Sequence, residues 1–322
     1  MIFFCTKAIF INKWNDWIMK IKYLIAYLIL PITITSCSSG ENETEDIPVT
    51  PPAVTKKEIK ISTNVSGITK ATDTGFDPND KCGLYVVNRG VDNSSSALKA
   101  TGNHVDNMRF TYNSTWTPDT PIYWMDNTTH ADFYLYFPYQ SGISDVNAMS
   151  FSVKTDQNSE SAYKASELLI GSVKDVAPTE SAVVINAKHV LSQMVVNVAA
   201  GNGFTTESLA AANVGVTING TKVSATVDIA TSAVSATGDA QSIKPWNTDG
   251  AWKALVIPQN VAETNLITVN VDGKDYNLKK AFTFVSGKSH KFTVTVSKTN
   301  NGINVNIDGW ETDDTDNGGV AE

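Results

Sequence analysis

The amino-acid sequence predicts an all-β fold on two grounds. Apolar and polar residues alternate along most of residues 58–310, and valine, isoleucine and aromatic residues fill many of the apolar positions. A period of two with such residues is typical of β-strands. Residue pairs that favour tight turns separate the apolar runs, and in hairpins asparagine, aspartate and glycine readily adopt the positive φ angles required. These pairs are Asn219-Gly220, Asp272-Gly273, Ser286-Gly287 and Asn301-Gly302.

Many short strands joined by regular turns indicate β-sandwiches. Helical patterning is weak, and residues 161–169 and 205–212 are each expected to hold one or two helical turns. The first strand is expected at about residues 57–65, with Ile59, Ile61 and Val65 directed inward and Thr63 on the same face.

The length of the chain after its N-terminal leader, about 285 residues, suggests two domains. Most aromatic residues precede position 187, whereas valine and isoleucine dominate the apolar positions after it. We therefore expect an N-terminal β-sandwich domain at residues 56–187, a C-terminal one at 188–311, and an acidic tail at 312–322.

The N-terminal segment has the organisation of a secretory signal peptide. Lys20 and Lys22 precede an apolar run that extends to residue 35, and a basic segment followed by an apolar one is typical of such peptides. The run is shorter than a comfortable transmembrane helix requires, and it contains Pro31. We expect the signal peptide to be residues 1–36, with Met19 as the more suitable start.

Cys37 follows this segment directly, in the sequence Ile34-Thr35-Ser36-Cys37. That arrangement resembles the bacterial lipobox, in which the cysteine thiol receives a diacylglycerol and becomes the new N-terminus. The alternative is an ordinary signal peptide with an incidental cysteine. Since two acyl chains or more give lasting anchorage, Cys37 is the predicted lipidation site of an outer-membrane lipoprotein.

Residues 37–55 are expected to form a tether. This segment is acidic and then rich in proline and threonine, without an apolar period, and such sequences bury too little surface to fold. Its cluster Glu41, Glu43, Glu45 and Asp46 resembles the acidic signal that sends some lipoproteins of Bacteroidales to the outer face of the outer membrane. The alternative is a plain solvated linker.

The charge of the expected mature chain limits its partners. The whole sequence has 25 basic and 33 acidic residues; residues 1–36 carry four lysines and one aspartate, so the remainder has 21 and 32, a net charge of −11. A general nucleic-acid binder needs a basic face, so that class is excluded. Attraction to anionic lipid is excluded as well, and the lipid has to supply the membrane anchor.

We find no signature of an enzyme, a metal site or a cofactor. Apart from Cys37, only Cys82 lies in the expected mature chain, and it reads as a buried structural residue rather than a thiol nucleophile. The four histidines lack ligand spacing, and His189 is expected to serve packing or hydrogen bonding. Sequences typical of serine hydrolases, zinc proteases and P-loops were not found.

Several segments, in order, resemble the fimbrillin family of Bacteroidales (Mfa-like), the lipoprotein-derived subunits of type V pili. Together they cover nearly all of residues 58–310. They are Ile59–Ser62 with Thr69–Thr72, Phe76 and Gly83–Val86; Trp116 with Pro121–Trp124 and Ala131–Tyr139; Leu168-Leu169 with His189–Val196; Val256–Gln259; and Phe284 with Gly287-Lys288, Phe292–Val296 and Ile307–Trp310.

The resemblance implies two transthyretin-like β-sandwich domains and a specific assembly route. In the family, a trypsin-like protease cuts after a basic residue in the loop that follows the first strand. Removal of that strand leaves a groove that a strand of another subunit fills. In this sequence the cut is expected at Lys70-Ala71, although the family more often has arginine there.

Two functions therefore remain open at the level of sequence. One is a structural or adhesive subunit of a fimbrium, at the stalk, tip or anchor, whose partners are other pilin subunits and host or bacterial surface molecules. The acidic, glycine-rich residues 311–322 would make a poor donor strand and favour a tip, anchor or accessory role. The other is a non-polymerising surface lipoprotein that binds glycans, for which the aromatic run at residues 133–139 could be a stacking platform. The alternative for that run is a buried core strand.

Overall fold

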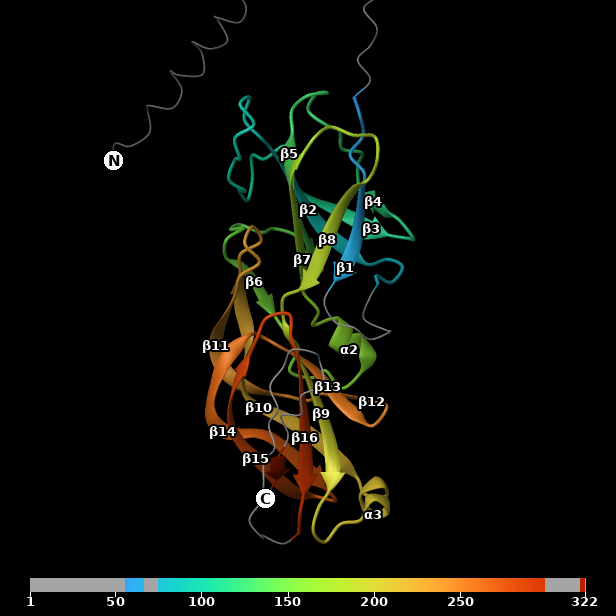
Figure 1. Ribbon diagram of the computed structural model, residues 1–322, viewed down its shortest axis with the longest axis vertical. Coiled ribbons are helices and arrows are strands. Elements are labelled where there is room, and N and C mark those ends of the chain that lie inside the picture. Colours follow the sequence, from blue (N-terminus) through green and yellow to red (C-terminus); the bar gives the residue numbers. More distant parts are fainter. Residues whose placement is uncertain (1–55, 67–74, 299–318, 322) are drawn as a thin grey trace, which may run out of the picture. The chain divides into compact units, whose positions relative to one another are not determined.

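The computed structural model describes residues 56–66, 75–298 and 319–321, and the regular secondary structure of these residues is almost entirely β-strand (Figure 1). The predicted all-β fold is confirmed. Two short helices interrupt the strands, α2 (Glu160–Lys164) and α3 (Thr206–Ala210), close to where helical turns were expected. Within the described residues neither helix has the length and apolar character needed to cross a membrane.

Strands from the first half of the chain form one seven-stranded sheet with the spatial order β1-β8-β7-β5-β2-β3-β4. Its neighbours pair antiparallel, except that β1 lies parallel to β8 at the edge of the sheet (Figure 1). The strands are β1 (Ile61–Ser66), β2 (Lys81–Asn88), β3 (Val105–Tyr112), β4 (Trp116–Pro118), β5 (Ala131–Phe137), β7 (Leu169–Val176) and β8 (Val183–His189).

The remaining strands form two five-stranded sheets. One has the order β11-β10-β14-β15, with β6 also paired to β10, and the other has the order β12-β13-β9-β16-β17. The strands of the first are β6 (Met149–Ser152), β10 (Val214–Val227), β11 (Val234–Ile243), β14 (Gln259–Val271) and β15 (Lys274–Phe284); those of the second are β9 (Ser192–Ala200), β12 (Trp246–Thr248), β13 (Ala251–Val256), β16 (Ser289–Val296) and β17 (Gly319–Ala321).

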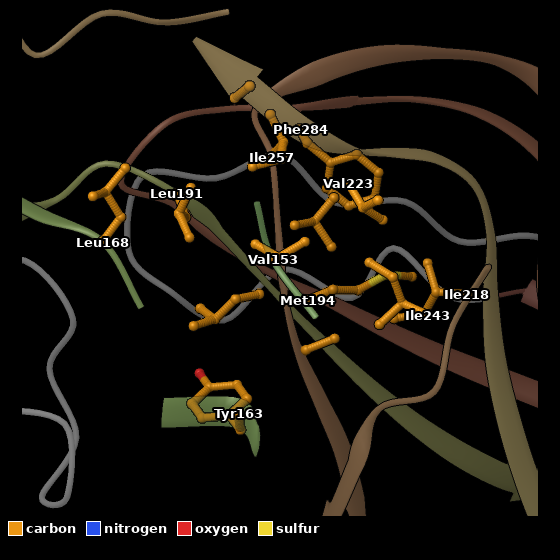
Figure 2. Packing of buried hydrophobic residues seen from close by; sticks show 14 of the residues in the cluster. Val153, Tyr163, Leu168, Leu191, Met194, Ile218, Val223, Ile243, Ile257 and Phe284 are labelled. Atoms are coloured by element: carbon orange, nitrogen blue, oxygen red, sulfur yellow. The ribbon is translucent and has the colours of Figure 1, made fainter. Parts of the chain in front are cut away.

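Two clusters of buried apolar side chains hold these sheets together. The smaller cluster lies within the seven-stranded sheet and includes Ile59, Phe110, Trp124 and Phe133. The larger one contains side chains of both five-stranded sheets, among them Met194, Ile218 and Phe284 (Figure 2), and also Tyr85 and Tyr136 of the seven-stranded sheet. Because β6 precedes residue 187 yet pairs with β10, the first half of the chain also contributes to the second group of sheets. The domain boundary at residue 187 and the transthyretin-like topology stay predictions.

The predicted turns have mixed outcomes. Asp272 and Gly273 have φ angles of 52° and 86° and join β14 to β15 as predicted. Ser286-Gly287 likewise lies between β15 and β16. The prediction for Asn219-Gly220 is wrong, because this pair lies inside β10 at a shift in its pairing with β11. Gly220, with φ 72°, forms a bulge there rather than a turn. Asn301-Gly302 lies outside the described residues.

His290 gives the fold a pH dependence. Its ring is buried against Phe282 and Phe284, and Nε2 accepts a hydrogen bond from the Val285 N–H at 3.2 Å. Burial, with a smaller contribution from the charge of Lys288, lowers the pKa of His290 to about 4. The neutral ring is therefore the form that the folded protein holds.

We expect the stabilisation from neutral His290 to be complete above its unfolded pKa of about 6.5 and to be lost as the pH falls toward 4. One pKa unit corresponds to about 1.4 kcal/mol. We therefore expect the natural protein to lose about 2 kcal/mol of unfolding free energy between pH 7 and pH 4.5 through His290. The His290→Gln variant should not show this loss. Urea unfolding at pH 7 and pH 4.5 measures it, and equal losses in both proteins would contradict it.

Candidate functional site

The first strand, β1, occupies the edge of the seven-stranded sheet and contacts a strand far away in sequence. Residues Ile61–Ser66 pair parallel with residues 183–188 of β8, in a register that places Ile61 opposite Val183 and Asn64 opposite Asn186. The Val183 N–H donates to the Lys60 carbonyl oxygen at 2.8 Å. An edge strand can leave its sheet without passing through it, and its departure would expose the hydrogen-bonding groups of β8.

The residues just before β1 pair on a second side. The Ile59 N–H donates to the Ile122 carbonyl at 2.8 Å, and the Trp124 N–H donates to the Lys57 carbonyl at 2.9 Å. The chain entering β1 is thus paired with residues 122–124, which follow β4, while β1 itself is paired with β8. We call the space bounded by these two partners the first-strand groove.

The groove is filled mainly by two isoleucines. Ile59 and Ile61 are 1% and 5% exposed and belong to the core cluster of the seven-stranded sheet. Val65 packs against the same cluster but is only partly buried. Burial of an isoleucine side chain is worth about 1.5–3 kcal/mol, so the two isoleucines bind this segment strongly to the rest of the sheet.

One polar contact also holds the first strand inside the groove. The indole Nε1 of Trp116 donates a hydrogen bond to the Thr63 hydroxyl at 2.9 Å. Trp116 is 7% exposed, and its ring makes aromatic contacts with Phe76 and Tyr112 at centroid distances of 4.8 and 5.1 Å. This bond is not predicted from the sequence, although a threonine at an inward position of an apolar face indicates a buried hydrogen-bond partner.

Two cavities adjoin the first strand. One, of about 460 Å³, lies along β1 and is lined by Ile61, Thr63, Phe76 and Trp116 among others. The second, of about 480 Å³, begins at Val65 and extends toward Phe137, Leu169 and His189. Both cavities lie beside the first strand and share Val65, Gly75 and Phe76 as lining residues.

Charged side chains surround the second cavity. The buried His189 ring pairs through Nδ1 with Glu167 Oε1 at 2.9 Å, as expected of a residue that serves hydrogen bonding. Hydrogen bonds from Lys164 to Asp77 and Glu160, at 2.8 and 3.0 Å, raise the pKa of Lys164. Burial raises the pKa of Asp80. The contacts of His189 and Lys164 are thus satisfied ion pairs between described residues.

The other residues singled out in the sequence have structural positions. Cys82 is completely buried in the core cluster, and burial raises the pKa of its thiol, so it is a structural residue as predicted. In β5 the residues Phe133, Tyr134 and Tyr136 are buried, which agrees with the core-strand interpretation, whereas Phe137 and Tyr139 at the end of the run are partly exposed. Among the described residues, no group of three or more His, Cys, Asp or Glu side chains could hold a metal ion.

The predicted lipidation and cleavage sites cannot be compared with the structure. Cys37, Lys70 and Ala71 all lie outside the described residues, as do Ile307–Trp310. Of the predicted site residues, the structure brings together Ile59, Ile61 and Val65 in one segment, and Lys70 follows this segment in the sequence.

Comparison with known proteins identifies the family. A profile of the family described as Fimbrillin-like matches residues 69–310. The chain belongs to the fimbrillin-like family. This fimbrillin-like chain is 24% identical over 308 residues to the "Putative fimbrium subunit Fim1C" of Bacteroides uniformis, covering 91% of this chain and 96% of that protein.

Solved structures show the same fold. A crystal structure titled "putative cell adhesion protein" from Bacteroides ovatus superposes with a TM-score of 0.60 at 15% identity, covering 74% of this chain and 92% of the other. A second structure with that title, from Bacteroides uniformis, gives a TM-score of 0.55 at 22% identity, with coverages of 75% and 94%. The fimbrillin-like fold thus extends over most of the described residues.

Proposed function

We propose that this protein is a structural or adhesive subunit of a type V fimbrium that assembles by strand addition. Membership of the fimbrillin-like family and the similarity to a fimbrium subunit support the role at the cell surface. That role is structural rather than catalytic. The partners are other pilin subunits, and at the exposed end of a fimbrium they include host or bacterial surface molecules.

In this proposal the lipid on Cys37 delivers the protein to the outer face of the outer membrane. Residues 37–55 act as the tether, and cleavage of the Lys70-Ala71 bond separates the body from the lipid. Because that cleavage follows the first strand, it also severs β1 from the rest of the fold. An anchor subunit would keep the lipid and remain uncut.

The position of β1 is the observation that carries the proposal. β1 is an edge strand that pairs through its backbone with β8, and the segment of β1 and the residues just before it buries Ile59 and Ile61 beside two cavities. After its removal, the exposed backbone of β8 and the empty apolar positions are best satisfied by another extended segment. A strand from a neighbouring subunit is such a segment.

Gel electrophoresis of unboiled surface material, with the variant Lys70→Gln, tests the proposal. The natural protein is expected to give a ladder of polymers, whereas Lys70→Gln gives a single band, because a trypsin-like protease requires a basic residue before the cut. The variant Lys99→Gln, which changes an exposed lysine of the described part of the chain, should retain the ladder. A single band for the natural protein would favour the stand-alone glycan-binding alternative.

A further inference from the structure

We infer that the first-strand groove selects a partner strand with a hydroxyl-bearing residue at the position of Thr63. This inference rests on the proposed function and specifies which strands the groove accepts. The required pattern at alternate inward positions is apolar, apolar, hydroxyl, apolar, as in Ile59, Ile61, Thr63 and Val65. The evidence is the hydrogen bond from Trp116 to Thr63.

Most contacts of the first segment would form with any sequence. The pairing with β8 and with residues 122–124 uses backbone groups, which every incoming strand carries. Two of the side-chain contacts lie at or near the surface: Lys57 Nζ donates to the Pro178 carbonyl at 3.3 Å, and Asn64 donates to Asn186 at 3.3 Å. Water can replace the partners of such groups, so these contacts discriminate little between strands.

The bond to Thr63 differs because its donor is buried. Trp116 is 7% exposed, and Phe76 and Tyr112 contact its ring. An indole has one N–H and no acceptor, so a strand with valine in place of Thr63 offers this buried donor no acceptor. Leaving a buried donor unsatisfied costs about 1–3 kcal/mol, whereas an apolar replacement of both partners is nearly neutral.

The second tryptophan near the groove provides a contrast. Trp124 Nε1 donates to the Thr179 carbonyl oxygen at 3.1 Å, and Thr179 lies outside the first strand. Trp124 therefore keeps its partner when the first strand is removed, whereas Trp116 loses its partner. Among the described residues of the groove, the requirement for a hydroxyl falls on one position of the incoming strand.

The C-terminal sequence of this chain does not meet the requirement. Its apolar run Ile303, Val305 and Ile307 has isoleucine in the third position, and no register of residues 299–322 has two alternate apolar residues followed by serine or threonine. The groove is thus expected to prefer a strand of a different subunit over this segment from a second copy of the same chain.

Peptide binding to the mature chain, cut at Lys70-Ala71 and freed of its N-terminal fragment, tests the inference. The probes are a peptide of residues 57–66 and its Thr63→Ser and Thr63→Val forms. We expect the threonine and serine peptides to bind similarly and the valine peptide about tenfold more weakly, since tenfold corresponds to about 1.4 kcal/mol. In the Trp116→Phe protein, which lacks the indole donor, the difference between threonine and valine should disappear. A peptide of residues 302–310 should bind more weakly than the native one.

The outcomes separate the inference from the function on which it rests. If no peptide binds the cut protein while it remains folded, strand addition itself fails. If all peptides bind with the same affinity, or if the valine penalty persists in Trp116→Phe, selection of a hydroxyl is wrong. If the cut protein unfolds, the interaction energy between Thr63 and Trp116 is measured in the intact chain instead. Thermal unfolding compares Thr63→Val, Trp116→Phe and the variant with both changes. Strictly additive effects on stability would overturn the inference.

Discussion

Oxidation of the double variant Asn64→Cys/Asn186→Cys is expected to abolish polymer formation. These two residues are partners in the parallel ladder of β1 and β8, their side chains are exposed, and they are hydrogen bonded at 3.3 Å. Neighbouring strands lie about 4.8 Å apart, within the Cα separation that a disulfide tolerates. The bond would hold β1 in its groove even after the Lys70-Ala71 bond is cut.

The oxidised variant should give a single band on an unboiled gel, and a reductant should restore the ladder. A disulfide elsewhere provides the matched control. Asn260 and Thr283 are also ladder partners with exposed, hydrogen-bonded side chains, on the hairpin of β14 and β15. Oxidised Asn260→Cys/Thr283→Cys should therefore polymerise normally. Cys82 is completely buried and is not expected to interfere. A ladder from the locked variant would mean that subunits join without release of β1.

Replacing Ile59 and Ile61 together with alanine is expected to lower the free energy of unfolding of the intact chain by about 4–7 kcal/mol. Both side chains are almost completely buried in the core of the seven-stranded sheet, and each isoleucine-to-alanine change in a core costs about 2–4 kcal/mol. The two sites are neighbours, so their effects need not add.

Urea unfolding measures this loss against a control on the opposite face of the same strand. Lys60 is exposed and Ser62 is partly exposed, so Lys60→Ala/Ser62→Ala should change the stability by less than about 1 kcal/mol. A small effect of the isoleucine pair, similar to that of the control, would show that the first strand contributes little to the fold. The groove would then offer little energy to an incoming strand.

The fold class could be predicted from the sequence because alternation and turn residues are local signals. The strand of Ile59 and Ile61 and the turn at Asp272-Gly273 follow from such signals alone. Asn219-Gly220 was misinterpreted because glycine with positive φ serves a bulge as well as a turn. The choice depends on whether β10 continues beyond the pair, and the strands that pair with that continuation, β11 and β6, are outside the local sequence.

The arrangement of the site could be predicted only in part. Alternation placed Thr63 on the inward face, but its partner Trp116 is 53 residues away, and no local pattern connects them. The parallel partner of β1 is more distant still, since Asn64 lies opposite Asn186. Resemblance to the family predicted a removable first strand. The hydrogen bond from Trp116, which makes the residue at position 63 important for pairing, could be found only in the three-dimensional structure.

The most direct test of the central claim is the N-terminal sequence and intact mass of subunits recovered from surface polymers. If the first strand is released and replaced, those subunits begin at Ala71 and lack residues 37–70, while the unpolymerised precursor retains them. Polymers whose subunits still contain Ile59 and Ile61, with a lipid on Cys37, would contradict strand replacement as the mechanism of assembly.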